Sequence, residues 1–274
     1  MILTALRWAA FLLVAFAINF PVLVTMVTSL KTPREIATNP TFWIEAPTLA
    51  NYAAVLTVTD RLNLFAYLWN SFAAALIGAG LAVLLALPAA YAIARGAWGR
   101  RVVFPLVVNL RAVPLIIFAI PIYMGFQWLG LLDTRLGLGL ILTIVNLPLA
   151  LVILVNAIGD LPEDLDEAAR IDGAGAFTIL ARIVAPLVRP ALATAFVFGF
   201  ITAWNEFLFG LMLTTRSAVP VTVGASFFFA TAGGGVQWGL AAAVMMIAAL
   251  PPMLLGLLMY RSISRSLPGG AVKG

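Results

Sequence analysis

The chain has 274 residues, of which 63% are hydrophobic and 10% charged, and its mean hydropathy is +1.08. A soluble core of this length cannot bury so many apolar side chains, so the composition indicates an integral membrane protein. Histidine and cysteine are absent, which excludes imidazole bases, thiolate nucleophiles, disulfides and Cys/His metal sites, and we expect neither a catalytic nor a metal centre. The net charge of +5 comes from basic residues between apolar runs, which favours membrane topology over nucleic-acid binding.

Six apolar runs are long enough to cross a bilayer, which takes about 20 residues per helix. They cover residues 8–30, 64–94, 102–128, 138–158, 191–213 and 239–260. We therefore expect one all-α integral membrane domain over 1–274, with six transmembrane helices. The first run follows Arg7 and contains Ala15-Phe16-Ala17, which a cleaved signal peptide could also carry. Its apolar stretch continues well past Ala17, so a retained helix is the favoured interpretation.

Small residues and prolines mark the second and third runs. Ala74, Gly78 and Ala82 have the four-residue spacing that allows close helix packing. Pro114 and Pro121 each remove a backbone donor, which predicts a kinked or partly unwound third helix.

Two ionisable residues lie inside apolar runs, Arg111 in the third and Glu206 in the fifth. A charge there costs about 2.5–3.5 kcal/mol on insertion scales, so each should face the bundle interior or water. They are candidates for a transport path, although an interhelical packing contact explains them equally well. Aromatic and amide side chains could hold a sugar beside them, and spacing alone does not tell which ones face a cavity. The candidate path residues are Arg111, Tyr123, Asn146, Trp204, Asn205 and Glu206.

The distribution of basic residues sets the expected orientation, because short basic loops stay in the cytoplasm. With the N-terminus inside, ten basic residues are cytoplasmic and five external, and Arg111 completes the 16. The opposite orientation reverses the ratio. Both termini are therefore expected in the cytoplasm, with an external loop at 31–63, a cytoplasmic loop at 159–190 and a cytoplasmic tail at 261–274.

The 159–190 loop has the pattern of a helix, a glycine turn and a second helix. Asp160 could cap the first helix, Pro162 suits its first turn, and Leu161, Leu165 and Ala168 form an apolar stripe. Gly173 and Gly175 should end it, and a second amphipathic stretch runs from 176 to 186. A solvated acidic loop is one interpretation. A compact helical pair of this length is better explained as a docking surface for a cytoplasmic partner.

The same loop carries a recognisable motif. Glu167-Ala168-Ala169, then Asp172-Gly173, then residues 183–187 (Ile-Val-Ala-Pro-Leu) resemble the EAA loop of ATP-binding-cassette importer permeases. The match departs at Ala185, where leucine is common. Further segments, spread in order over nearly the whole chain, resemble the carbohydrate-uptake branch of that family, the maltose and glycerol-phosphate type. They are residues 28–31, 35–36, 51–52, 70–71, 89–92, 130–133, 204–207 and 270–274, the last pointing to the smaller permease of a pair.

This resemblance implies a type I ABC importer transmembrane domain with a cytoplasmic helix-turn-helix coupling loop, in a bacterial inner membrane. Its partners would be a different second permease, an ATPase dimer, an external solute-binding protein and lipid. The implied ATPase contacts are Glu167, Ala168, Ala169, Asp172 and Gly173, with Lys273 and Gly274 of the tail. The resemblance implies no cofactor on this chain, with ATP and magnesium in the partner. The sequence agrees, because its only lysines, Lys31 and Lys273, lie in no phosphate-binding loop.

Two other functions share parts of this pattern. An ion-coupled secondary transporter is also an apolar bundle without an ATP site, and Glu206 is the clear candidate for its coupling carboxylate. An intramembrane hydrolase would need a serine with lysine or aspartate, and neither lysine lies within an apolar run.

Overall fold

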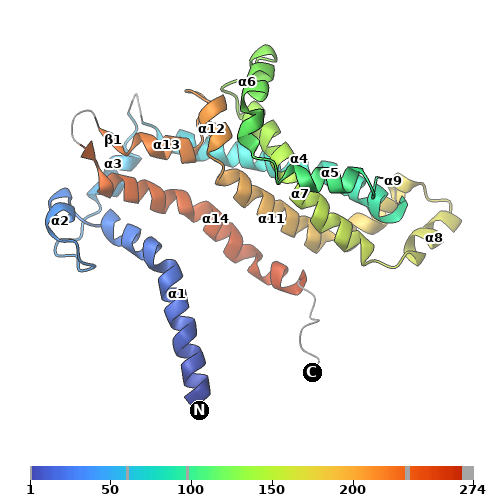
Figure 1. Ribbon diagram of the computed structural model, residues 1–274, viewed down its shortest axis with the longest axis horizontal. Coiled ribbons are helices and arrows are strands. Elements are labelled where there is room, and N and C mark those ends of the chain that lie inside the picture. Colours follow the sequence, from blue (N-terminus) through green and yellow to red (C-terminus); the bar gives the residue numbers. More distant parts are fainter. Residues whose placement is uncertain (1, 60–61, 97–98, 232–234, 267–274) are drawn as a thin grey trace. The chain divides into compact units, whose positions relative to one another are not determined.

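A computed structural model describes residues 2–59, 62–96, 99–231 and 235–266 of the chain (Figure 1). The chain forms two compact units, one of residues 1–66 with 223–250 and the other of residues 67–222 with 251–274. Helices dominate both. Two strands of two residues each, β1 (Ala230–Thr231) and β2 (Gly235–Val236), form a short antiparallel ladder that the sequence did not indicate.

The first unit contains α1 (Ile2–Ser29), α2 (Pro33–Thr38), α3 (Ala50–Leu56), most of α13 (Val221–Phe227) and the start of α14 (Trp238–Ser266). Asn51 of α3 links this helix to the end of α1. Its Nδ2 donates to the carbonyl oxygens of Ser29 and Lys31, both at 2.9 Å, which caps the end of α1. Gly239 leaves room for this amide, because a Cβ there would lie 2.7 Å from the Asn51 Oδ1.

The segment between α1 and α3 is folded around a buried lysine. Thr32 accepts a hydrogen bond from the Glu35 N–H and so caps α2, and Pro33 occupies its first turn. The Lys31 Nζ donates to the carbonyls of Asn39 at 2.8 Å and Thr41 at 2.6 Å. These bonds hold the proline-containing stretch after α2 against the end of α1.

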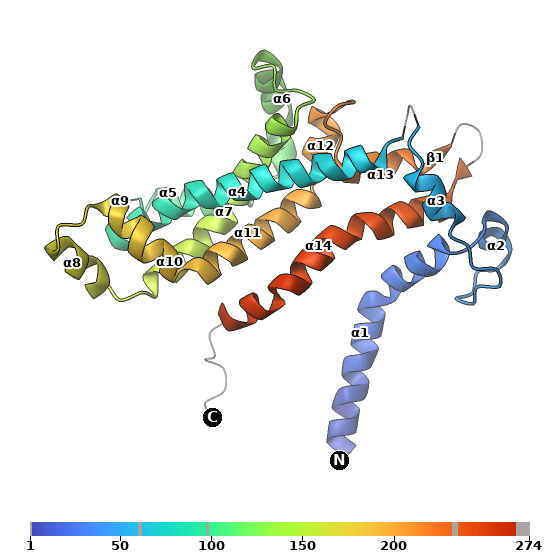
Figure 2. The same cartoon turned by 180° about the vertical axis from the view of Figure 1, so that it is seen from behind.

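The second unit is built on three helices, α4 (Leu64–Gly96), α7 (Arg135–Gly159) and α11 (Arg189–Trp204), which run side by side in Figures 1 and 2. Their contacts depend on small residues. A Cβ added to Gly78 would meet the Leu142 Cβ at 2.7 Å, and one added to Gly199 would meet the Ala79 Cβ at 3.3 Å. The predicted close packing at the small residues of the second run is therefore confirmed, with Ala74 and Ala82 each 1% exposed.

Four helices are long and apolar enough to cross a membrane among the described residues, namely Leu6–Ser29, Leu64–Gly96, Arg135–Gly159 and Trp238–Met259. The third run is broken into α5 (Val103–Leu110), the 3-10 helix η1 (Leu115–Phe118) and α6 (Ala119–Trp128). Its break includes Pro114, as predicted. Pro121, by contrast, fits in the first turn of α6, where the missing N–H has no helical acceptor to lose.

The fifth run is also broken, which the sequence did not indicate. It forms α11 and then α12 (Leu208–Leu213), separated by residues 205–207. Before α11 the chain bends by 79° between Ala176–Leu187 and Arg189–Trp204. The 176–187 stretch comprises α9 (Ala176–Ile179), the π-helix η2 (Leu180–Val184) and α10 (Ala185–Leu187).

The helix α8 (Asp164–Ile171) starts later than predicted. Asp160 ends α7 as its C-cap, and α8 begins after Glu163 without a side-chain cap. Gly173 follows α8 with φ +84°, which is the left-handed stop that the sequence predicted there. The prediction that Leu165 and Ala168 form the buried face of this helix is wrong, because both are exposed. Asp166 and Ala169 are buried in their place.

Candidate functional site

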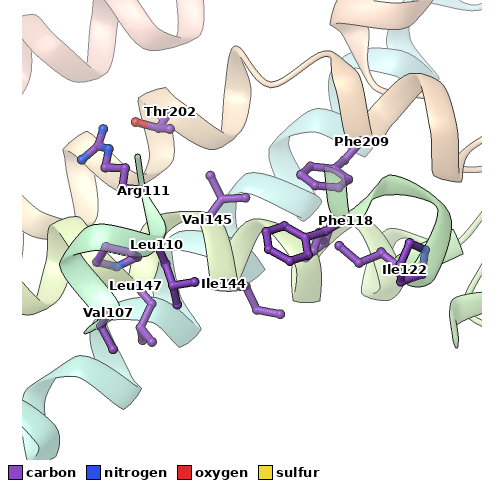
Figure 3. A pocket seen from close by; sticks show the side chains of 13 residues that line it. Val107, Leu110, Arg111, Phe118, Ile122, Ile144, Val145, Leu147, Thr202 and Phe209 are labelled. Carbon is purple, nitrogen blue, oxygen red and sulfur yellow. The ribbon is translucent and has the colours of Figure 1, made fainter. Parts of the chain in front are cut away.

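A cavity of about 650 Å³ opens in the second unit between α5, α6, α7, α11 and α12 (Figure 3). Its walls are mainly apolar, and Arg111 and Thr202 supply polar groups at one end. Phe118 and Phe209 line the other end. A cavity of this size suits a small organic ligand held by a few polar groups.

Arg111 is placed by the break in the third run. It is the C-cap of α5, and the chain after it leaves helical geometry until η1. Its side chain is exposed and forms no ion pair with any residue that the structure describes. A broken helix and a free guanidinium are both tolerated at membrane depth where they border a water-filled cavity. Arg111 is thus the one residue among the six path candidates that lines this cavity.

Glu206 makes local contacts with the helix that follows it. Its carboxylate accepts from the Phe209 N–H at 3.0 Å and the Gly210 N–H at 3.2 Å, so it caps α12 after the break in the fifth run. Glu206 and Arg111 do not form an ion pair. The neighbouring Asn205 donates from Nδ2 to the Ile201 carbonyl at 2.9 Å and so satisfies the end of α11.

The remaining path candidates lie elsewhere. Tyr123 is 40% exposed on α6, outside the cavity lining. Trp204 is 3% exposed and stacks on Phe200, with ring centroids 5.9 Å apart. Asn146 is 2% exposed, and neither of its side-chain amide atoms has a hydrogen-bond partner in the described part of the chain.

The motif residues of the 159–190 loop divide between two faces. Glu167, Ala168, Asp172 and Gly173 are exposed. Ala169 is 8% exposed and packs in the chain's own apolar core. Beside the exposed motif residues, Ile171 is 87% and Phe177 81% exposed, two large apolar side chains that the motif did not single out. Lys273 and Gly274 lie outside the described residues.

A buried polar junction lies under α8, and sequence reasoning missed it. The Tyr91 hydroxyl donates to the Asp166 Oδ1 at 2.6 Å, and the Arg95 Nε lies 3.0 Å from Oδ2 in an ion pair whose side chains are each 5% exposed. Arg95 Nη2 also donates to the Leu161 carbonyl at 2.9 Å. The available signal was the four-residue spacing of Tyr91 and Arg95, which puts both on one face at the end of α4.

Asp133 binds a turn at the opposite end of α7. Its carboxylate accepts hydrogen bonds from four successive backbone N–H groups, those of residues 215–218, at 2.8–3.1 Å. Burial alone would raise the pKa of Asp133, but these bonds favour the charged form and lower the pKa from 3.8 to about 2. No group of acidic side chains in the described ranges is arranged to hold a metal ion.

Comparison with known proteins gives the family. Residues 78–268 match the model of the "binding-protein-dependent transport system inner membrane component". The chain is 32% identical over 258 residues to a sulfoquinovosyl glycerol transport system permease protein of Agrobacterium fabrum, covering 93% of this chain and 89% of the relative. It is 36% identical over 229 residues to a trehalose/maltose transport system permease protein of Thermococcus litoralis, covering 83% and 82%.

The fold is also that of a solved transporter. A bacterial ABC transporter involved in the import of the acidic polysaccharide alginate matches with a TM-score of 0.76 and 20% identity, over 97% of this chain and 96% of the other. None of these matches supports the ion-coupled secondary transporter that the sequence left open. The chain belongs to the family of binding-protein-dependent transport system inner membrane components, as a permease subunit whose importer hydrolyses ATP on a separate subunit.

Proposed function

We propose that the chain is one of two different permease subunits in an ATP-driven, binding-protein-dependent importer of a sugar or sugar derivative. The observation that carries this proposal is the similarity, over most of the chain, to permeases named for glycosides. Besides the two relatives above, a diacetylchitobiose uptake permease of Streptomyces coelicolor is 28% identical over 98% of the chain.

The proposed topology has six crossings in a bacterial inner membrane, within one transmembrane domain over 1–274. Four crossings are continuous helices, and the broken third and fifth runs supply the other two. The excess of basic residues supports cytoplasmic termini, an external 31–63 loop, and a cytoplasmic 159–190 loop and 261–274 tail. Broken spans are expected where a helix borders protein or water rather than lipid.

The exposed apolar surface of α1 supports the presence of a second permease subunit. The most apolar window of Leu6–Ser29 has a mean hydropathy of 2.4, and 0% of it is buried within this chain. Such a helix needs lipid, another subunit or both around it. A heterodimer in which α1 packs against the second permease meets this need.

The ATPase docking surface is proposed on the outward side of the coupling loop (159–190). It comprises Glu167, Ala168, Ile171, Asp172, Gly173 and Phe177, all exposed. Isoleucine and phenylalanine so far exposed on a loop in water would be unfavourable without a partner, and a patch of this kind marks a protein contact. Lys273 and Gly274 of the tail are proposed as a second contact. ATP and magnesium bind the ATPase dimer, not this chain.

The solute path is proposed to pass the cavity at Arg111. The cavity volume of about 650 Å³ accommodates a mono- or disaccharide in scale, and Arg111 and Thr202 offer donors for sugar oxygens. Phe118 and Phe209 offer aromatic surface for sugar C–H groups. The external binding protein delivers the solute to this path.

Reconstitution tests the proposal. The four kinds of subunit are placed in proteoliposomes, and uptake of radiolabelled mono- and disaccharides is measured with the binding protein outside. Uptake should require ATP and persist after the proton gradient is collapsed. Uptake at full rate without the ATPase, or its loss with the proton gradient, contradicts the importer.

A second experiment addresses docking. Ile171→Asp with Phe177→Asp should reduce co-purification of the ATPase, because each carboxylate would have to be desolvated in the contact. Leu187→Asp serves as the control, since Leu187 is also exposed, at 49%, but lies outside the proposed surface. Equal ATPase recovery in all three samples contradicts the proposed docking surface.

A further inference from the structure

Tyr91, Arg95 and Asp166 form what we term the Asp166 junction. Tyr91 and Arg95 belong to the last turns of α4, and Asp166 to the first turn of α8. The hydroxyl and the guanidinium engage different oxygens of one carboxylate, Oδ1 at 2.6 Å and Oδ2 at 3.0 Å. The Arg95 Nη2 reaches further, to the backbone carbonyls of Leu161 and Pro162 ahead of α8. Both the helix and the segment leading to it are thereby tied to α4.

The junction lies among buried apolar side chains. Apolar residues of α4, α7, α8 and α9 pack around it, including Ile93, Ile158, Ala169 and Ile179, which are 0–8% exposed. Charges attract more strongly in such a medium than in water. Moving α8 away from α4 would break the Tyr91 hydrogen bond and the Arg95 ion pair, and it would expose the apolar side chains packed around them. The junction therefore resists a hinge motion between the two helices.

The coupling loop is connected to the membrane helices in two ways, through the backbone and through side-chain contacts. The coupling loop is covalently continuous with α7, which ends at Gly159, and with α11, which begins at Arg189. The helix α4 is not adjacent to the loop in sequence and meets it through the side chains of Tyr91 and Arg95. Gly173, with φ +84°, interrupts the loop just after α8, so α8 could swivel there if nothing else held it.

Neighbouring residues of α8 point to opposite sides of the helix. Glu167 and Ile171 face out, toward the proposed ATPase contact, while Asp166 and Ala169 face in. A displacement applied to the outward face must pass through the inward face to reach the membrane helices. Among the inward contacts, Asp166 supplies the polar ones, a directional hydrogen bond from the Tyr91 hydroxyl and an ion pair with Arg95.

We propose that the Asp166 junction is the joint through which movement of the coupling loop is transmitted to α4, so that α4, α7 and α11 move together. Tyr91, Arg95 and Asp166 are positioning residues in this role and do not touch solute or ATP. The inference rests on the proposed function, because it requires an ATPase acting on the outward face of α8.

The test separates transmission from folding by measuring solute transported per ATP hydrolysed in the reconstituted importer. Asp166→Asn removes the negative charge and Tyr91→Phe removes only a hydroxyl, so the second variant remains informative if the first folds poorly. In both, the ATPase should stay bound and hydrolyse ATP, while the solute-to-ATP ratio falls by about fivefold or more, the lower end of typical coupling between sites. A merely structural defect lowers uptake and hydrolysis together and leaves the ratio unchanged.

Asp164→Asn is the matched control, because it makes the same substitution at an exposed position of the same helix. Its ratio should equal that of the unaltered protein. The chain has no cysteine, so Arg95→Cys with Asp166→Cys can be bridged selectively by a bifunctional thiol reagent. Bridging should restore the ratio, and cleaving a reducible bridge should lower it again.

Three outcomes overturn the inference: an unchanged ratio in Asp166→Asn and Tyr91→Phe, an equal fall in Asp164→Asn, or loss of ATPase binding in the junction variants. Failure of the proposed function is a different result. In that case the unaltered importer itself shows no ATP-dependent uptake, so there is no ratio to lose.

Discussion

The Asp133 carboxylate accepts the Ser217 N–H at 2.8 Å, which joins the turn before α7 to the turn after α12. Three more N–H groups of the same turn converge on the other oxygen. Asp133→Ala removes the acceptor of all four and should destabilise the subunit by about 1–3 kcal/mol, the cost of unpaired donors. The midpoint of thermal unfolding of the purified complex measures this. Glu163→Gln, at an exposed position without such bonds, should leave the midpoint unchanged, and equal midpoints for all three proteins contradict the role of Asp133.

The low pKa of Asp133 gives the same contact a pH dependence. Because the pKa in the fold is about 2, below the ordinary 3.8, the folded state favours the carboxylate. That stabilisation is complete above about pH 4 and is lost as the pH falls toward 2. The difference in unfolding midpoint between the unaltered protein and Asp133→Asn should therefore be constant from pH 8 to pH 5 and shrink on acidification below 4. A difference that grows below pH 4 would show the opposite linkage.

Local sequence was sufficient for features that depend on local chemistry. Glycine at 173 and proline at 114 mark the stop of α8 and the break in the third run because their backbone preferences act wherever they stand. The four-residue spacing of Ala74, Gly78 and Ala82 likewise fixed a packing face of α4. These signals need no knowledge of the partner segment.

Features that depend on distant partners were missed. Asp166 lies 75 residues from Tyr91, and in an acidic stretch nothing distinguishes it from its exposed neighbours Asp164 and Glu167. The facing of Leu165 and Ala168 was wrong for the same reason. Glu206 was predicted to serve a transport path or a packing contact. Its hydrogen bonds to α12 were not predicted, because residues 205–207, where the helix breaks, contain neither proline nor glycine. Which side of a helix is buried, and which distant residues pair, depends on tertiary contacts that the spacing of apolar residues in the sequence does not show.

Two glycines of α4 should respond oppositely to alanine. A Cβ at Gly78 meets the Leu142 Cβ at 2.7 Å and its backbone carbon at 3.3 Å, whereas a Cβ at Gly80 meets nothing within 4 Å. Gly78→Ala should thus force α4 from α7 and cost about 1–3 kcal/mol through overpacking. Gly80→Ala should instead be neutral or stabilise by up to about 1 kcal/mol through helix propensity. Unfolding midpoints compare them, and a midpoint for Gly78→Ala at or above that of Gly80→Ala contradicts the packing described.

Asn146 and Asn70 provide a second matched pair. Asn146 is buried with an unbonded amide, so Asn146→Leu should raise stability, by about 1–3 kcal/mol if the full desolvation cost is relieved. Asn70 donates to the carbonyls of Ser217 and Val219 and accepts from the Arg135 Nε, so Asn70→Leu should lower stability. If Asn146→Leu instead unfolds at a lower temperature, its amide has a partner in the membrane-embedded complex. If Asn146→Leu is more stable but no longer transports solute, the amide is needed for transport rather than for folding.

Arg111 and Glu206 should behave as independent residues. They form no ion pair, Arg111 faces the cavity, and Glu206 is occupied by the N–H groups of Phe209 and Gly210. In a double-mutant cycle with Arg111→Gln and Glu206→Gln, the interaction free energy from unfolding should stay within about 0.5 kcal/mol, as for residues without shared partners.

Glu206→Gln alone should lower stability, because it weakens the cap of α12. Arg111→Gln should leave stability nearly unchanged and reduce solute uptake, because it removes a cation from the cavity and breaks no ion pair with a described residue. Restoration of uptake by exchanging the two charges, Arg111→Glu with Glu206→Arg, would instead mean that the pair meets in a state of the transport cycle other than this one.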